Sequence, residues 1–264
     1  MEKKSPKKPA CLTVVANEEV TPNMRRITLS GKALANYPNI DSAAYVKLFF
    51  DFAGNPLSVP PESMNEAQLR TYTVRSLDRQ AQSISLDMAL HGEGKQSGPA
   101  SHWAKRASKG DKIIVGGPGS SKGLAEHYDW VLFAGDMTSL PAISVYLEKL
   151  PGSTQGYAVI QITSEEDKQV LVKPDGVEIK WVIGNAPSLA DVVDGLNWLP
   201  GTPGIWAACE FSSMRALRSL FVKDRNIAHE QIYISSYWRE GRSEDQHKAD
   251  KRKDAEVFAA KLIQ

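Results

Sequence analysis

The chain has 264 residues, of which 42% are hydrophobic and 24% are charged. This composition is typical of a globular protein and excludes a small disulfide-stapled scaffold and a largely disordered chain. Lys and Arg number 32 against 31 Asp and Glu, a formal net charge of +1, so no overall field indicates a nucleic-acid-binding or membrane-surface protein. No apolar stretch approaches the roughly 20 residues of a membrane helix.

The two ends of the chain and its cysteines carry little structural signal. Residues 1–10 are rich in Lys and Pro, which predicts a disordered N-terminal tail. Cys11 and Cys209 stand almost the whole chain apart with no second pair, which favours a reducing, cytoplasmic compartment. We further expect a monomer with no nucleic-acid or membrane partner.

Residues 11–124 predict an antiparallel six-stranded β-barrel domain. Short runs rich in Val, Ile, Thr, Phe and Tyr are separated by turn residues. Closure of such a sheet into a barrel removes its exposed edges. The expected strands cover 11–16, 24–30, 45–51, 70–75, 83–90 and 112–115, with one helix at 99–107.

Residues 125–264 predict an α/β domain with a parallel sheet and a C-terminal helix. After a glycine-rich loop at 116–123, apolar strands alternate with helical stretches, the pattern of strands buried on both faces. Ligands bind such sheets at the carboxyl ends of the strands. The expected strands cover 130–134, 157–162, 180–183, 205–209 and 231–236, and the expected helices 140–149, 214–223 and 246–263.

The strand at 70–75 is unusual because it carries two arginines and a tyrosine. Alternation places Arg70 and Tyr72 on one face and Thr73 and Arg75 on the other. One interpretation is a cofactor site, in which an arginine pairs with phosphate, the Tyr72 ring packs on a planar heterocycle and Thr73 gives a hydrogen bond. The other is an exposed strand with cross-strand charge pairs.

The segment from Gly98 to Ala104 predicts a helix whose first turn could hold an anion. Proline suits the first helical position, and the small residues Ala100 and Ser101 let a ligand approach the open N–H groups. That arrangement suits a pyrophosphate. The alternative is an ordinary helix start that packs Trp103 into the barrel.

Further motifs extend from about Val14 to Gly241. They are Leu86-Asp87-Met88-Ala89-Leu90-His91-Gly92, Gly110-Asp111, Gly117-Pro118-Gly119-Ser120, Ala134-Gly135-Asp136-Met137-Thr138-Ser139-Leu140-Pro141-Ala142-Ile143, Trp206-Ala207-Ala208-Cys209-Glu210 and Tyr237-Trp238-Arg239-x-Gly241. Together with Arg70-x-Tyr72-Thr73-x-Arg75 and the Gly98 segment, they resemble the siderophore-interacting protein family. These are flavin-dependent ferric-siderophore reductases related to the ferredoxin-reductase superfamily.

The resemblance implies an FAD-binding barrel followed by an NAD(P)-binding-like domain. The first domain would hold the isoalloxazine and a phosphate, with Thr73 near the flavin N5. No side chain would be catalytic, because the flavin itself carries the electrons. The residues that the resemblance places on FAD are Arg70, Tyr72, Thr73, Asp87, Met88, His91, Ala100, Ser101, Asp136, Thr138 and Leu140.

The resemblance also implies a basic pocket for an anionic ferric siderophore and a docking place for an electron donor. Single electrons would pass from FAD to the bound Fe(III), releasing Fe(II). The donor could be NADH, NADPH or reduced ferredoxin. The residues placed on the substrate are Lys47, Arg239, Arg242 and Lys248, and those placed on a nucleotide are Glu210, Arg215 and Arg218; Lys251, Arg252 and Lys253 could extend the basic surface, or simply form a solvated helix face.

The chain departs from the family pattern at two positions. Met137 stands where the family commonly has Glu, which removes a carboxylate, and Cys209 stands where it commonly has Gly, which adds a side chain near a dinucleotide. Cys209 is interpreted either as a reactive thiol or as a small apolar group at a strand end.

Three other functions remain open on the residues alone. The chain could be a flavin reductase of another electron acceptor, or a non-catalytic carrier that binds siderophore. The segment Gly119-Ser120-Ser121-Lys122-Gly123 fits the Gly-x-Ser-x-Gly pattern of a hydrolase, but such an elbow needs a helix directly after its serine, and the sequence predicts a strand there. The five histidines show no metal-binding spacing.

Overall fold

The computed structural model describes residues 8–35, 37, 43–92 and 98–262. These form two compact units, neither of which is one continuous stretch. The first comprises Met1–Gly123, Pro141–Leu150 and Thr163–Val172, and the second comprises Leu124–Leu140, Pro151–Ile162 and Lys173–Gln264. Of the expected tail, residues 1–7 lie outside the described residues, whereas Ala10 already begins the first strand.

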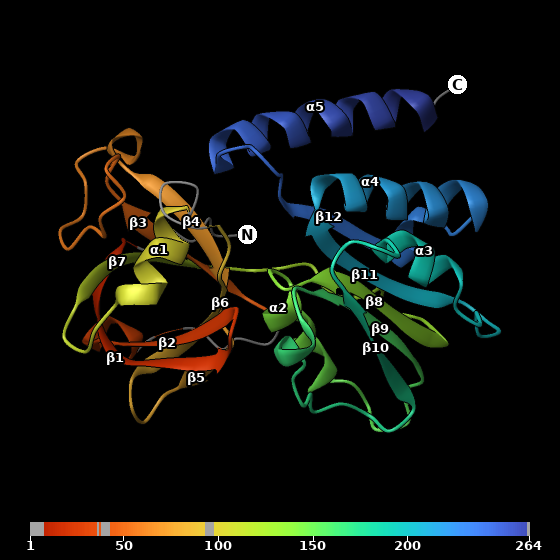
Figure 1. Cartoon of the computed structure of the whole chain (residues 1–264), viewed down its shortest axis with the longest axis horizontal. Helices are drawn as coiled ribbons and strands as arrows, with labels where there is room; N and C mark the ends of the chain where they lie inside the picture. The colour runs from red at the N-terminus through yellow and green to blue at the C-terminus, as the bar shows by residue number, and fades with distance from the viewer. Residues whose placement is uncertain (1–7, 36, 38–42, 93–97, 263–264) are drawn as a thin grey trace, which may run out of the picture. The chain divides into compact units, whose positions relative to one another are not determined.

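An antiparallel sheet of seven strands builds the first unit (Figure 1). Its order is β4-β3-β7-β1-β2-β6-β5. The strands are β1 (Ala10–Thr21), β2 (Met24–Ser30), β3 (Tyr45–Phe50), β4 (Gln68–Thr73), β5 (Ser76–Asp78), β6 (Ser83–Ala89) and β7 (Lys112–Gly119). Short 3-10 turns are η1 (Lys32–Leu34), η2 (Met64–Glu66) and η4 (Glu165–Asp167).

This sheet curves like a barrel but does not close, which corrects the expectation of six closed strands. Among the described residues no ladder joins the two end strands, β4 and β5. The additional strand is the short β5, which pairs with β6 from Ser76 to Asp78. Residues 116–119 continue β7 instead of forming the expected loop. Gly119 lies against the ring of Tyr45, which occupies the place where a Cβ atom would stand, so only glycine fits at this position.

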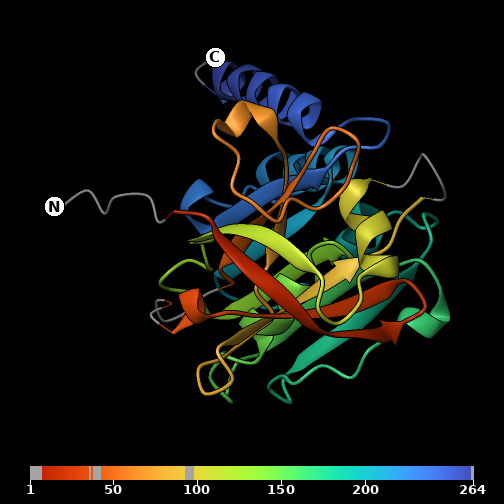
Figure 2. The ribbon, with the colours of Figure 1, turned by 90° about the vertical axis from the view of Figure 1, so that its left-hand side faces the viewer.

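Alternation along the strands produces the core of the first unit. In β6, Ile84, Leu86 and Met88 are fully buried while the residues between them are polar. A period of two places every second side chain on one face of a strand. Helix α1 (Pro99–Arg106) packs on the same core, where Trp103 meets Phe50 edge to face with ring centroids 6.1 Å apart. Figure 2 turns this unit toward the viewer and shows α1, in yellow, on its right-hand side.

A parallel sheet of five strands builds the second unit, in the order β10-β9-β8-β11-β12. Every residue of β8 is buried, as expected for a strand covered on both faces. The predicted parallel α/β class is therefore confirmed. The strands are β8 (Trp130–Asp136), β9 (Gly156–Ile162), β10 (Val177–Ile183), β11 (Pro203–Glu210) and β12 (Ile232–Trp238).

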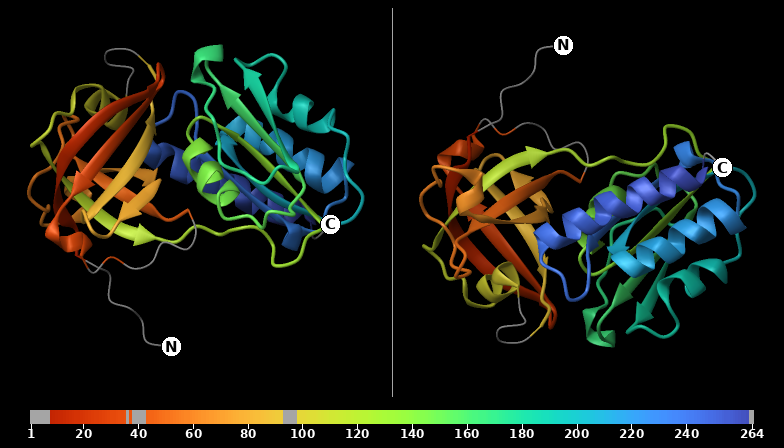
Figure 3. Two further views of the ribbon diagram at one scale, coloured as in Figure 1. Left: turned by 90° about the horizontal axis from the view of Figure 1, so that it is seen from below. Right: turned by 90° about the horizontal axis from the view of Figure 1, so that it is seen from above.

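The helices of the chain's second half follow the strands, and one of them was not expected from the sequence. That helix is α3 (Leu189–Asp194), whose Ser188–Asp191 capping box starts it. Helices α4 and α5 run side by side (Figure 3, right). The remaining elements are α2 (Leu140–Leu147), α4 (Phe211–Ser219), the π-helical turn η5 (Leu220–Asp224), η6 (His229–Gln231) and α5 (Glu244–Leu262).

Candidate functional site

Strand β4 presents the Arg-x-Tyr-Thr motif beside β3. Tyr72 pairs with Val46, and Arg70 pairs with Leu48, so these side chains share the inner face of the sheet. Tyr72 is half-buried and packs against the core, and the Arg70 guanidinium donates to the carbonyl of the adjoining Leu69 at 2.8 Å. Both motif residues therefore lie where the inner face reaches the rim of the sheet.

The first turn of α1 lacks a side-chain cap. Its N-cap is Gly98, which has no side chain to accept from the helix N–H groups, and Pro99 follows at the first position. The Ser101 hydroxyl is held by the main chain of His91, accepting from its N–H at 3.1 Å and donating to its carbonyl at 3.2 Å. Ala100 and Ser101 are buried, so what they can offer a ligand is their main-chain N–H.

Positive charge gathers around this uncapped turn. Desolvation lowers the pKa of His91, and the charges of Lys105 and Arg70 lower it further. Lys105 Nζ donates to the carbonyl of Gly92 at 3.3 Å. Open helix N–H groups with adjacent cations match a diphosphate in charge and geometry. The residues present therefore fit the pyrophosphate of a dinucleotide such as FAD.

Two residues of β6 that the resemblance places on FAD face other partners. Both carboxylate oxygens of Asp87 accept from Arg26, at 2.6 and 2.7 Å, and Arg75 lies 3.8 Å away. The hydrogen bond to Asp87 raises the pKa of Arg26 most. Met88 is fully buried in the core. From these two positions the strand offers a ligand main-chain groups rather than free side chains.

Lys47 stands on the opposite face of β3 from the core. It pairs with Thr71 of β4 and Gly116 of β7, while its neighbours Val46 and Leu48 are fully buried. Within the described ranges 8–35, 37, 43–92 and 98–262, Lys47 forms no ion pair and no side-chain hydrogen bond. Its ammonium group is thus available to an anion.

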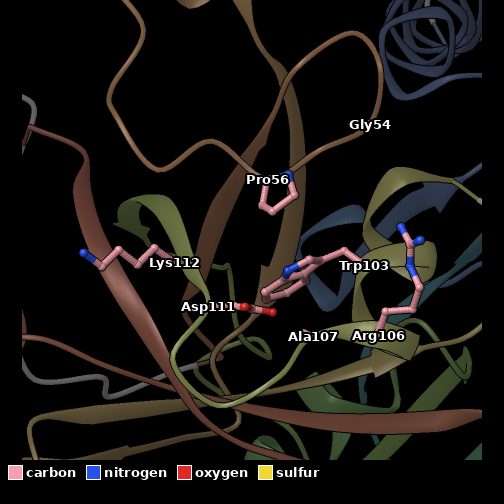
Figure 4. Close-up of a pocket in the computed structure, with 7 residues that line it drawn as sticks. All are labelled: Gly54, Pro56, Trp103, Arg106, Ala107, Asp111 and Lys112. Carbon is pink, nitrogen blue, oxygen red and sulfur yellow. The ribbon is translucent and has the colours of Figure 1, made fainter.

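A hollow of about 360 Å³ lies beside the C-terminal half of α1 (Figure 4). Trp103 and Arg106 approach it from the helix, and Asp111 from the turn before β7. None of the predicted cofactor residues lines this hollow. Its full lining is Gly54, Pro56, Trp103, Arg106, Ala107, Asp111 and Lys112.

In the second unit, Asp136 ends β8 and is satisfied entirely by the protein. Its Oδ1 accepts from the N–H and hydroxyl of Thr138, at 2.9 and 2.5 Å, and its Oδ2 accepts from the Glu210 N–H and the Trp238 indole, both at 2.8 Å. Burial raises its pKa, although these hydrogen bonds act in the opposite direction. Leu140 is also buried. Asp136, Thr138 and Leu140, all three predicted to contact FAD, therefore offer a ligand no polar side-chain group other than the hydroxyl oxygen of Thr138.

Of the residues predicted to dock a nucleotide, Glu210 is the N-cap of α4, and Arg215 and Arg218 lie on the helix itself. The carboxylate of Glu210 accepts from the N–H groups of Ser212 and Ser213. Arg215 and Arg218 both pair with Asp254 of α5, at 3.2 and 2.7 Å. Each predicted group therefore already has a partner inside the second unit.

The basic residues predicted for the substrate in the second unit are also ion-paired. Arg239 and Arg242 approach one oxygen of Asp250, at 2.6 and 3.4 Å, and Arg239 lies over the Phe211 ring. Lys248 pairs with Glu244 at 3.1 Å. Lys251 donates to the Ser235 hydroxyl at 2.6 Å, although the residue as a whole stays exposed.

The two departures from the family pattern are both buried. Met137 is 7% exposed and Cys209 is fully buried in the core of the second unit. Burial raises the pKa of the Cys209 thiol well above its usual value, and the charges of Asp136 and Glu210 raise it further. A thiol in this environment stays protonated and packs as a small apolar group.

The sequence interpretation missed two residues of the candidate site. Lys105 lies one helical turn after Ser101, and the i, i+4 spacing was a usable signal for it. Arg26 becomes evident only through the register of β2 and β6, where it pairs with Asp87.

The hydrolase alternative at Ser121 fails on its context, because no helix lies between Ser121 and Trp130. In the described part of the chain no cluster of metal ligands and no helix able to cross a bilayer is found.

Comparison with known proteins covers both units. Residues 13–122 match the siderophore-interacting FAD-binding domain, and residues 128–241 match the siderophore-interacting protein model. The ferric vibriobactin reductase ViuB of Vibrio cholerae is 32% identical over 253 residues, 90% of this chain and 92% of its own length. The NADPH-dependent ferric-chelate reductase of Escherichia coli is 30% identical over 239 residues, 86% of this chain and 91% of its own.

A solved structure agrees with these relatives. The siderophore-interacting protein SipS from Aeromonas hydrophila has a TM-score of 0.82 and 29% identity, covering 94% of this chain and 98% of its own. The open antiparallel barrel and the parallel sheet give the chain the ferredoxin-reductase-like fold class, which a ferredoxin NADP+ reductase from Neisseria gonorrhoeae shares at a TM-score of 0.65 and 12% identity, over 87% of this chain and 99% of its own. Within that class, the chain belongs to the siderophore-interacting protein family.

Proposed function

We propose that the chain is an FAD-dependent ferric-siderophore reductase. The observation that carries this proposal is the uncapped first turn of α1 with Arg70, His91 and Lys105 around it, in a segment that matches the family's FAD-binding domain. The relatives named for ferric vibriobactin and ferric-chelate reduction support the same activity. FAD, when bound, supplies the electrons that reduce Fe(III) to Fe(II), which its chelator holds less tightly.

The residues of the first unit bind and orient this cofactor. The N–H groups of Ala100 and Ser101, with Arg70, hold the diphosphate, and Tyr72 packs on the ring system. Burial, and then the charges of Lys105 and Arg70, lower the pKa of His91, which favours the neutral imidazole, a donor or acceptor of a hydrogen bond. Thr73 gives a hydrogen bond to the ring.

The substrate is an anionic ferric chelate that cationic side chains attract. Lys47 has no ion pair within the described residues, so it is the strongest candidate in the first unit. Arg239 and Arg242 share one carboxylate, which leaves one positive charge in excess among these three groups. The donor is NADH, NADPH or reduced ferredoxin, and the protein works as a monomer in the cytoplasm, consistent with its two free cysteines.

Anaerobic stopped-flow spectroscopy tests the proposal. The protein, reconstituted with FAD and reduced with dithionite, should reoxidise within seconds when a ferric catecholate chelate is added, with Fe(II) trapped by ferrozine. The same protein should turn over slowly with quinones. Failure to bind FAD, or reoxidation no faster with the chelate than without it, would show that the chain is not this reductase and would favour a carrier.

A further inference from the structure

Arg75 is the one residue of the Arg-x-Tyr-Thr-x-Arg motif that the proposed cofactor site does not use. It stands two positions after Thr73, at the corner where the chain changes its partner strand. Thr73 pairs with Tyr45 of β3, whereas the N–H of Arg75 donates to the carbonyl of Ser85 in β6 at 2.8 Å. Because only Val74 separates Thr73 from Arg75, whatever fixes this corner also limits where Thr73 can lie.

Two carboxylates hold the side chain of Arg75. Its Nη1 donates to Oε2 of Glu148 at 3.2 Å, and its Nη2 donates to Oε1 of the same carboxylate, which is the two-pronged geometry of strong arginine pairs. Its Nε lies 3.8 Å from Oδ2 of Asp87, which also accepts from Arg26. Only 22% of the Arg75 side chain is exposed. The guanidinium is thus part of a row of alternating charges and has little freedom to move.

Glu148 comes from a part of the chain that is far from the motif in sequence. It directly follows α2, a helix in which every residue is buried. Residues 141–150 belong to the first unit, although the strand β8 before them belongs to the second. The hydroxyl of Tyr146 in the same helix donates to the carbonyl of Lys122 at 3.0 Å. Burial and this hydrogen bond hold the end of α2 in the first unit, so Glu148 is a firm anchor for Arg75.

We propose that Arg75 and Glu148 are positioning residues for the flavin: their ion pair fixes the corner after β4 and thereby holds the Thr73 hydroxyl toward the ring of FAD. This inference rests on the proposed function, in which Thr73 gives a hydrogen bond to that ring. Hydrogen bonds to a flavin ring tune its electronic properties, and side chains behind the contacting residue keep such bonds in place. Arg75 and Glu148 act through Thr73 and need no contact with FAD themselves.

The absorption spectrum of the FAD-loaded protein tests this role. Glu148→Gln keeps the shape of the side chain and removes its charge, and Arg75→Lys keeps a cation but loses the two-pronged pair. Each should shift the flavin absorption band and slow reoxidation of the dithionite-reduced protein by a ferric catecholate chelate about 5- to 20-fold, short of the ~100-fold cost of a 1 Å misplacement. The affinity for FAD should stay close to that of the parent.

A Thr73→Val background separates positioning from a general structural effect. This variant lacks the hydroxyl, so adding Glu148→Gln to it should change neither the band nor the rate further, whereas independent effects would add. The matched control is Glu19→Gln, which breaks the ion pair of Glu19 with Arg25, 3.3 Å apart in the same unit. Its spectrum and rate should equal those of the parent.

Parent-like spectra in both Glu148→Gln and Arg75→Lys would overturn the proposal, and so would an undiminished effect of Glu148→Gln in the Thr73→Val background. Arg75→Lys decides the matter alone if Glu148→Gln folds poorly. The spectrum requires bound FAD but no ferric chelate. A parent protein that no chelate reoxidises would therefore reject the reductase function, while the band shift would still decide the role of the ion pair.

Discussion

The indole Nε1 of Trp238 donates a hydrogen bond of 2.8 Å to Oδ2 of Asp136, 102 positions earlier in the chain. It connects the last residue of β12 to the last residue of β8. The N–H of Glu210, at the end of β11, joins the same oxygen. Because Asp136 is buried, one carboxylate thus holds together the carboxyl ends of three parallel strands.

Asp136→Ala should therefore destabilise the protein strongly. It leaves the part-buried N–H groups of Thr138, Glu210 and Trp238 without their acceptor, and we expect the free energy of unfolding to fall by about 2–4 kcal/mol. Trp238 should become more accessible to acrylamide, measured by fluorescence quenching. Trp238→Phe removes only one of the hydrogen bonds and should cost about 0.5–1.5 kcal/mol; equal losses in the two variants would argue against Asp136 as the shared anchor.

Asp167→Asn should make the first unit less stable in a pH-dependent way. Asp167 is fully buried and accepts from Thr21 and from Asn23. Burial acts to raise its pKa, but the hydrogen bonds from Asn23 and Thr21 outweigh it and the pKa is lowered. The ionised form is thus the one that the fold favours, so its stabilisation is present at pH 7 and is lost as pH falls below about 4 through the lowered pKa.

Urea unfolding measures this difference. Asp167→Asn should lose about 1–3 kcal/mol at pH 7, and its difference from the parent should shrink near pH 3. Glu166→Gln alters an exposed carboxylate in the same turn and should change little at either pH. A deficit of the Asp167 variant that stays constant between pH 7 and pH 3 would contradict the assignment.

Flavin retention should depend on Arg70 and not on Arg106. Arg70→Ala removes a cation beside the first turn of α1, and we expect FAD affinity to fall about 10- to 100-fold, as for the loss of a charge-assisted hydrogen bond. Arg106→Ala changes an exposed arginine of the same helix at the hollow of Figure 4. Flavin absorbance after ultrafiltration measures both, and equal losses would place the cofactor elsewhere.

Lys47→Ala should weaken substrate binding more than it slows turnover. The loss of one unpaired cation should raise KM for an anionic ferric chelate roughly 3- to 10-fold at low salt, with kcat nearly unchanged. Added salt should narrow the gap between variant and parent, because screening removes the attraction. Lys112→Ala, an exposed lysine of β7, serves as control, and parent-like kinetics of the Lys47 variant would remove this residue from the substrate site.

The two thiols should differ in reactivity. Cys11 is exposed, whereas Cys209 is buried with a raised pKa. A disulfide reagent should therefore titrate one thiol in the native protein and two after denaturation. Cys209→Ala should bind FAD like the parent, and a fast-reacting second thiol in the native state would mean that Cys209 is reachable.

Local patterns of the sequence predicted most of the elements. Alternation along β2 and β6 and the continuous apolar run of β8 reflect burial on one or both faces, which residue types reveal directly. The strand at residues 76–78 escaped prediction because three residues carry no periodicity, and α3 because six residues span less than two turns. Both are short enough that tertiary contacts decide them.

The candidate site was predicted less completely, since long-range contacts determine which charges stay free. Motifs indicated Arg70, Ala100 and Ser101 near one another. They could not show that Asp87 would form an ion pair with Arg26, or that Asp254 would form ion pairs with both Arg215 and Arg218. Such pairings depend on strand register and on how helices pack, neither of which residue spacing encodes.

The hydrogen bonds that Asp167 accepts from Thr21 and Asn23 can form only late in the synthesis of the chain. The β1–β2 turn leaves the ribosome long before its partner, which is synthesised some 145 positions later. The first unit therefore cannot complete its contacts while translation is at residue 123. A gene cut there would encode a fragment in which the side chains of Thr21 and Asn23 lack these hydrogen bonds.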